Sequence, residues 1–139
     1  MHNTARAAAT YQRVEVTSRS PLELVILLYD GAIGALRQTH TAMVEKDLVA
    51  KARHMKKAMQ VVHHLQSTLN MEEGGEVATS LDTVYRDVVT RVLEANVTGR
   101  PELLHEAVML LTTVRTAWTE ITTGGASVSA PAAGPRAGL

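Results

Sequence analysis

The sequence has no cysteine and no phenylalanine among its 139 residues. Without cysteine the chain cannot form a disulfide framework, a thiolate metal site or a thiol nucleophile. Without phenylalanine, and with Trp118 as its one tryptophan, it must build its core from Leu, Val, Ile, Met and Ala, a mixture that suits helices packed on helices. We expect a single domain with one core, as is usual at this length.

The chain also lacks an excess of charge, because 14 basic residues balance 14 acidic ones. This balance removes the electrostatic footprint that binding to nucleic acid or anionic membranes requires. The most apolar segment, residues 22–36, is interrupted by Glu23 and Asp30 and is shorter than the roughly 18 to 20 residues of a membrane span. Residues 1–10 are not apolar enough for a secretion signal. We therefore expect a soluble, cytoplasmic protein with no membrane insertion.

Local signals divide the chain into helices. Ser20-Pro21-Leu22-Glu23 is typical of a capped helix start, Asp47 is a second candidate cap, and the glycines within residues 71–76 break the periodicity. Thr98-Gly99-Arg100-Pro101 ends one helix and begins another. The predicted helices cover residues 21–45, 47–70, 77–98 and 101–122.

Apolar side chains recur at steps of three and four in each predicted helix, and we expect them to form the core. Short connections make neighbouring helices antiparallel, so the prediction is an all-α, up-down-up-down four-helix bundle over residues 20–122. Residues 123–139 are rich in Gly, Ala and Pro and are predicted to be a disordered tail. The expected core residues are Leu22, Ile26, Tyr29, Ile33, Leu36, His40 and Met43, then Leu48, Ala52, Met55, Met59, Val62 and Leu69, then Val77, Leu81, Val84, Tyr85, Val88, Val92 and Ala95, then Leu104, Ala107, Leu111, Val114, Trp118 and Ile121.

The sequence offers little support for catalysis. A carboxylate-bridged di-metal bundle needs two Glu-x-x-His motifs, and only Glu102 and His105 provide one, in the first turn of a helix. His63 and His64 are adjacent, so on a helix they point about 100° apart and cannot share a tetrahedral metal as an i, i+4 pair can. We expect no metal, no cofactor and no enzymatic activity, and keep the di-metal enzyme as a minor alternative.

Three residues in the first helix are unusual. Gly31 and Gly34 each cost about 1 kcal/mol relative to alanine inside a helix. Tight packing within the bundle is the favoured explanation, and close approach of a bound segment is the alternative. Asp30 lies beside the core stripe and is expected to form a structural ion pair.

Apolar side chains extend beyond the core stripes in every predicted helix, at Leu27, Leu28, Val61, Leu65, Val89, Leu93, Leu103 and Leu110. A globular bundle uses part of such an excess for its own core. The remainder could form a groove for an amphipathic partner helix. Met55, Met59 and Met71 either offer adaptable surface to that partner or fill the core.

Several strings, taken together, resemble the flagellar secretion chaperone FliS family. They are Tyr11-Gln12, Ser20-Pro21-Leu22-Glu23, Leu28-Tyr29-Asp30-Gly31-Ala32-Ile33, Leu69-Asn70-Met71-Glu72-Glu73-Gly74-Gly75-Glu76-Val77-Ala78, Leu93-Glu94-Ala95-Asn96 and Ala117-Trp118, in the order of the family. The sequence departs from the family at Asn70, where an acidic residue is usual, and at Val88-Val89, near where another aromatic is common.

The resemblance implies a cytosolic export chaperone without a cofactor. It would bind the disordered C-terminal segment of flagellin, prevent premature polymerisation and help deliver subunits to the flagellar export apparatus. Residues 1–19 would form a cap over part of the binding surface. The residues expected to contact the client are Tyr11, Gln12, Val61, Leu65, Leu69, Met71, Tyr85, Val89, Leu93 and Asn96. The main alternative is a self-associating helical module with no flagellin client.

Overall fold

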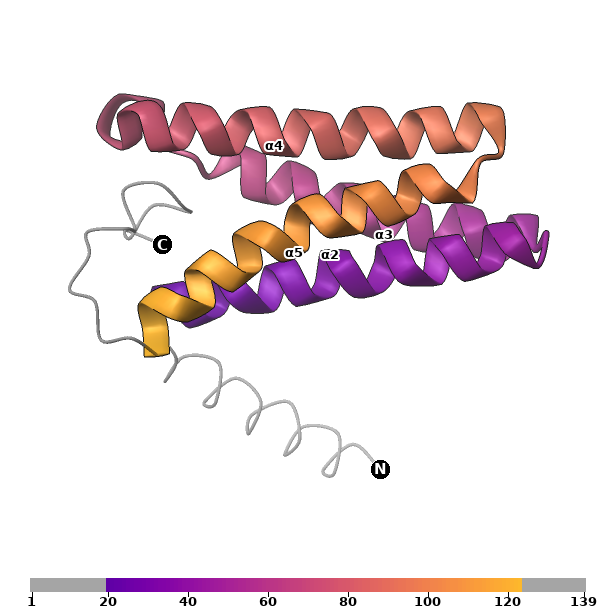
Figure 1. Cartoon of the computed structure of the whole chain (residues 1–139), viewed down its shortest axis with the longest axis horizontal. Helices are drawn as coiled ribbons and strands as arrows, with labels where there is room; N and C mark the ends of the chain where they lie inside the picture. The colour runs from indigo at the N-terminus through magenta and orange to yellow at the C-terminus, as the bar shows by residue number, and fades with distance from the viewer. Residues whose placement is uncertain (1–19, 124–139) are drawn as a thin grey trace, which may run out of the picture.

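The computed structural model describes residues 20–123, and this part of the chain folds as four helices with no strand. They are α2 (Pro21–Val44), α3 (Leu48–Ser67), α4 (Met71–Thr98) and α5 (Pro101–Thr123). Successive helices run in opposite directions, which confirms the predicted up-down-up-down bundle (Figure 1). The predicted cap segment, with Tyr11 and Gln12, and almost all of the predicted tail lie outside the described residues. No helix within residues 20–123 is long and apolar enough to cross a membrane.

Side-chain caps fix where the first two helices begin. The Ser20 hydroxyl accepts a hydrogen bond from the Glu23 backbone N–H at 3.1 Å, and the Glu23 carboxylate accepts one from the Ser20 N–H at 2.9 Å. Asp47 Oδ1 accepts from the Ala50 N–H at 3.1 Å at the start of α3. These bonds satisfy backbone donors that a helix start leaves free. Both predicted caps are confirmed.

The junction between α3 and α4 differs from the prediction. Asn70 caps α4 by accepting a bond from the Glu73 N–H at 2.9 Å, so this helix begins at Met71 and not at Val77. Gly75 has φ 54° and ψ −130°, which are not helical angles, so two helical segments meet at a kink there within α4. Only glycine adopts such angles readily, since it has no Cβ to clash. The predicted break at the glycines is therefore confirmed, but a capped helical turn that begins at Met71 precedes it.

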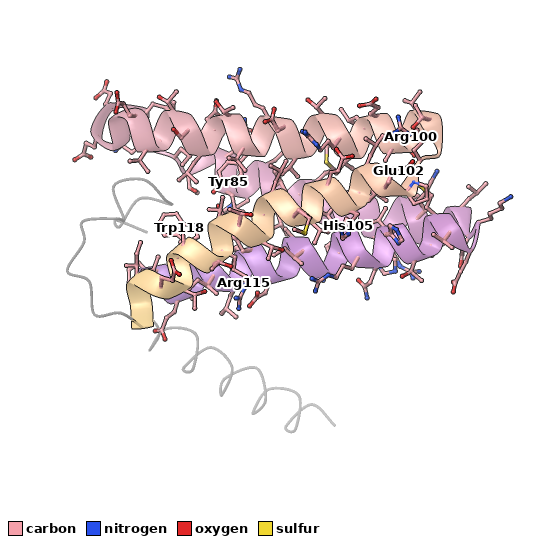
Figure 2. All side chains as sticks on the ribbon, viewed as in Figure 1. Tyr85, Arg100, Glu102, His105, Arg115 and Trp118 are labelled. Atoms are coloured by element: carbon pink, nitrogen blue, oxygen red, sulfur yellow. The ribbon has the colours of Figure 1, made fainter. Side chains whose placement is uncertain are left out.

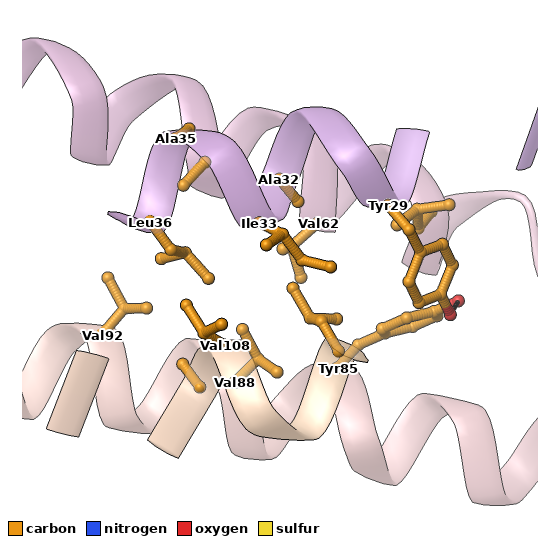
Figure 3. Close-up of a cluster of buried hydrophobic side chains, with 14 of the residues drawn as sticks. Tyr29, Ala32, Ile33, Ala35, Leu36, Val62, Tyr85, Val88, Val92 and Val108 are labelled. Carbon is orange, nitrogen blue, oxygen red and sulfur yellow. Dashed lines mark hydrogen bonds between the residues drawn. The ribbon is translucent and has the colours of Figure 1, made fainter. Parts of the chain in front are cut away.

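The core is a layer of aliphatic side chains and two tyrosines enclosed by the four helices (Figure 3). Its largest fully buried members are Tyr29, Tyr85, Leu36, Leu65, Leu104, Leu111, Val62, Val88 and Val92. Most predicted core positions are confirmed, but Leu48 and Val77 are 69% and 55% exposed, and Ala52 is exposed as well. Leu48 is the first residue of α3 and Val77 follows the kink at Gly75, so each lies near an end of the bundle where fewer helices surround it.

A small polar cluster lies within this core. The Tyr29 and Tyr85 hydroxyls are 2.5 Å apart and hydrogen-bonded, and the pair joins α2 to α4 (Figure 3). Burial raises the pKa of Tyr29, and its bonds to neighbouring groups lower it only in part. Burial also raises the pKa of Tyr85, and the neighbouring Tyr29 raises it further. The buried Trp118 indole lies close enough to Tyr29 to lower its pKa, although its N–H makes no hydrogen bond of normal geometry within residues 20–123.

The helices do not pack on one another equally. α2 packs extensively on α3 and α5, and α4 packs on α5, whereas contacts between α3 and α4 are sparse. Asp30 on α2 forms an ion pair with Arg115 on α5, as predicted for that carboxylate. At the boundary between α3 and α4, where contacts are sparse, the Gln66 side-chain amide donates a hydrogen bond from Nε2 to Asp82 Oδ1 at 2.9 Å.

The two glycines of α2 are not explained by tight packing. A Cβ built on Gly31 or Gly34 would meet no atom within 4 Å, other than near neighbours of its own helix. Both residues are only partly buried. The prediction that they allow close contact with another helix of the bundle is wrong. The bound-segment alternative stays a prediction.

Candidate functional site

The boundary between α3 and α4 carries an apolar surface that the bundle leaves incompletely covered. Gln66 and Asp82, which join the helices, identify the flank of each that faces the other. Positions seven residues apart share a helix face. From Gln66 this flank continues to Met59, and from Asp82 it continues to Val89. Met55 and Leu93 lie one turn further along the two helices. We call Met55, Met59, Val89 and Leu93 the α3–α4 surface.

Exposure is graded across this surface. Leu93 is 51% exposed, whereas Met55, Met59 and Val89 are partly buried against the core. Leu48, 69% exposed, extends the same flank of α3, since it precedes Met55 by seven residues. The surface therefore has partly buried side chains at its centre and exposed ones at its edge. Such a surface can bind an apolar segment of another chain.

Three predicted client residues lie together on this side of α4. Val89 and Leu93 belong to the α3–α4 surface, and Asn96, seven residues after Val89, is exposed beside them. The client residues predicted from the sequence did not include Met55 and Met59, although their helical spacing and flexible side chains were a visible signal. Their membership follows from the direction of α3 relative to α4, which the periodicity of one helix does not give.

Two other predicted client residues are in the core. Leu65 and Tyr85 are fully buried, so in this conformation neither side chain presents any surface to a client. Leu65 packs among the helices, and Tyr85 is hydrogen-bonded to Tyr29. Helical spacing alone could not separate them from the neighbouring surface positions, because they lie on the same broad apolar face.

Val61 faces away from this group. It follows His54 by seven residues, and His54 lines a hollow together with Arg37 and Thr41 of α2. Val61 is therefore on the flank of α3 that faces α2, where it packs against the core. The structure does not bring it together with Val89 and Leu93.

Leu69 and Met71 lie at the turn where α3 passes into α4. Leu69 packs against the core and is partly buried, whereas Met71 is 48% exposed. Met71 also lines an open hollow of about 590 Å³ with Gly75 and Glu76. These two residues form an apolar patch at the end of the bundle opposite Leu93.

The carboxylate at one end of the α3–α4 surface is already paired. Asp82 accepts the bond from Gln66 and also forms an ion pair with Arg86 at 3.0 Å. This leaves apolar burial as the main interaction that the surface can offer. The geometry suits binding by shape and hydrophobicity.

The single Glu-x-x-His motif lies elsewhere, at the start of α5 (Figure 2). Glu102 is exposed, and a hydrogen bond to its own backbone N–H, helped by Arg100, lowers its pKa. No group of three or more His, Asp or Glu side chains within the described part of the chain is arranged to hold a metal ion. Glu102 is thus part of a helix start.

Fold and surface together define a class: a helical bundle that offers an apolar surface to another polypeptide. The family described as "Flagellar protein FliS" matches residues 3–125. The chain is 33% identical to the flagellar secretion chaperone FliS of Salmonella typhimurium over 85% of this chain and 91% of that protein. It is 32% identical to the FliS chaperone of Vibrio cholerae over 80% of this chain and 85% of the relative.

A third relative is the flagellar secretion chaperone FliSB of Pseudomonas aeruginosa, which is 32% identical over 81% of this chain and 93% of its own length. These matches span the whole bundle and extend beyond its motifs. The chain belongs to the FliS family of flagellar secretion chaperones.

Proposed function

We propose that this protein is a cytoplasmic export chaperone that binds the disordered C-terminal segment of flagellin. Binding would keep flagellin from polymerising too early and would help deliver it to the flagellar export apparatus. Membership of a family of secretion chaperones supports a protein client in flagellar export. The choice of the C-terminal segment of flagellin as the client rests on the resemblance to this family, and the apolar surface is compatible with it.

The α3–α4 surface is the observation that carries the proposal. Its partly buried methionines and valine, with Leu93 at the rim, give an incoming chain apolar area to cover. A disordered segment that folds as it binds gains this burial and loses conformational freedom, which costs roughly 2 to 5 kcal/mol of the interaction energy. Methionine side chains adapt to different contacts at little cost.

Isothermal titration with a peptide from the C-terminal end of flagellin tests the proposal directly. We expect binding at micromolar concentrations or tighter, with a strongly negative heat-capacity change because apolar area is buried. The absence of binding at these concentrations would refute the assignment of the client.

The Leu93→Asp variant tests the location of the site. A carboxylate at the rim would be desolvated by the client, so we expect affinity to fall about tenfold or more, at unchanged helical circular dichroism. Val49→Asp is the matched control, since Val49 is 76% exposed and lies away from the α3–α4 flank, and it should bind like the parent. Equal losses in the two variants would place the site elsewhere.

Light scattering distinguishes the self-associating module from a client chaperone. If the exposed apolar groups serve only self-association, the protein forms a stable oligomer that the flagellin peptide leaves unchanged. A client chaperone instead forms a defined complex with the peptide.

A further inference from the structure

Helix α5 has two hollows, one on each side of Met109. One, of about 370 Å³, lies between α4 and α5 and is lined by Val84, Leu110 and Val114 among others. The second, of about 310 Å³, lies between α2 and α5. Met109 and His105 line both hollows, and Met109 is 52% exposed on the ridge between them. The hollows therefore form one continuous surface across α5.

The α4–α5 hollow is apolar and electrically neutral. Its charged lining residues, Arg91 and Glu106, form an ion pair with each other at 3.1 Å. The pair leaves neither charge in need of a ligand. The aliphatic side chains of this hollow consequently favour an apolar group.

The α2–α5 hollow has a different charge pattern. Its lining includes Arg37, His40 and His105, and no acidic residue. Arg37 also borders a hollow that contains Glu45 and Asp47, yet within residues 20–123 it forms no ion pair with either. One permanent cation and two imidazoles thus line a hollow to which residues 20–123 bring no counter-charge.

A threonine hydroxyl adds hydrogen-bonding capacity at the same place. Thr41 and Thr112 line the α2–α5 hollow. The Thr112 hydroxyl oxygen is buried and has no hydrogen-bond partner among the described residues. Because this oxygen is closed to solvent, the exposed Thr41 hydroxyl is the one that a ligand in the hollow can reach.

We propose that the outer face of α5 is a second docking surface, for an amphipathic helix of a partner protein that carries a carboxylate beside its apolar ridge. The apolar side chains would enter the α4–α5 hollow over Met109. The Glu or Asp carboxylate would enter the α2–α5 hollow and pair with Arg37. Charge complementarity selects this occupant, because an arginine with adjacent hydrogen-bond donors matches a carboxylate.

This docking surface is separate from the α3–α4 surface. α3 and α5 make few contacts with each other, and each is held in place by α2 and α4. Figure 2 shows His105 in the first half of α5, on the ribbon that passes in front of α3 and α2. A flagellin segment and a second protein could therefore occupy the chaperone together.

A pair of synthetic helical peptides tests the proposal. Both consist of Leu and Ala with one polar residue beside the central leucine, which is Glu in one peptide and Gln in the other. We expect the Glu peptide to shift the NMR signals of His40, His105 and Met109 in the full chain, and to bind about tenfold more tightly than the Gln peptide. Equal affinities for the two peptides, or no shift of these three signals, would overturn the proposal.

The Arg37→Gln variant assigns the carboxylate contact. Arg37 is exposed, so the substitution should preserve the fold, as circular dichroism will verify. It should remove the preference for Glu over Gln, while the control Arg53→Gln, at an exposed arginine of α3, should keep it. A preserved preference in Arg37→Gln contradicts the assigned contact.

Inorganic phosphate separates a docking surface from a simple anion site. At millimolar concentrations phosphate should displace little of the Glu peptide, because phosphate has no apolar part to enter the α4–α5 hollow. Full displacement of the peptide would show that the site recognises only an anion, and the proposed docking surface would be wrong.

Discussion

The α2–α5 and α3–α4 boundaries of this bundle are built differently. Between α2 and α5 the helices pack extensively and are joined by the Asp30–Arg115 ion pair. Between α3 and α4 contacts are sparse, Met55, Met59 and Val89 are only partly buried, and Leu93 is half exposed. The α2–α5 boundary therefore holds its two helices more firmly than the α3–α4 boundary does.

The comparison predicts that equal truncations will have unequal costs. Leu65→Ala removes a fully buried side chain and should lower the free energy of unfolding by about 2 to 5 kcal/mol. Leu93→Ala should lower it by less than about 1 kcal/mol, because half of that side chain is already in water. Chemical denaturation of the two variants measures the difference. Similar losses would mean that Leu93 is a structural residue and that the α3–α4 surface is not a free one.

Alkaline pH should weaken the core through the tyrosine pair. Burial raises the pKa of both Tyr29 and Tyr85, so above about pH 10 the unfolded chain releases phenolic protons that the native chain retains. The stabilisation is thus complete below pH 10 and is lost as the pH rises. Each tyrosine contributes up to about 1.4 kcal/mol per pH unit.

Tyr85→Phe sharpens this test. The slope of unfolding free energy against pH above 10 should become shallower by about one tyrosine's share, measured by denaturation at several pH values. Between pH 7 and 9 the slope of unfolding free energy against pH should be the same in the variant and in the parent protein. An unchanged slope above pH 10 would mean that Tyr85 ionises in the native protein.

The smallest expected effect on stability comes from the Asp30–Arg115 ion pair between α2 and α5. The Asp30 and Arg115 side chains are 44% and 35% exposed, so Asp30→Asn should cost no more than about 1 kcal/mol. The difference from the parent protein should shrink at high salt, because exposed charges are screened. A larger loss that is independent of salt would show that the pair, and not apolar packing, secures α5 on α2.

Local chemistry explains which parts of the fold were predictable. Ser20, Glu23 and Asp47 cap their helices with bonds that span three residues, so the sequence order already contains the interaction. The break at Gly75 was predictable from the pair of glycines, whereas the helix start at Met71 was missed although Asn70 and Glu73 have the spacing of a capping pair. The exposure of Val77 follows from the same kink.

The candidate site was predictable in type but not in detail. Broad apolar faces correctly indicated side chains beyond those the core covers, such as Leu93. Periodicity does not say which flank of a helix meets which neighbour, and for that reason Val61 was grouped with α4 although it faces α2. Leu65 and Tyr85 show the same limit, since position on an apolar face does not fix depth.

The burial of Trp118 gives this protein a built-in spectroscopic reporter. It is the single tryptophan in the chain, is 5% exposed, and lies beside Tyr29 near the end of α5. Selective excitation of tryptophan will therefore give blue-shifted fluorescence from Trp118 alone. This emission will shift to the red when the bundle unfolds. A client bound at Leu93 is remote from this indole, so stability and binding can be followed in the same sample without an added label.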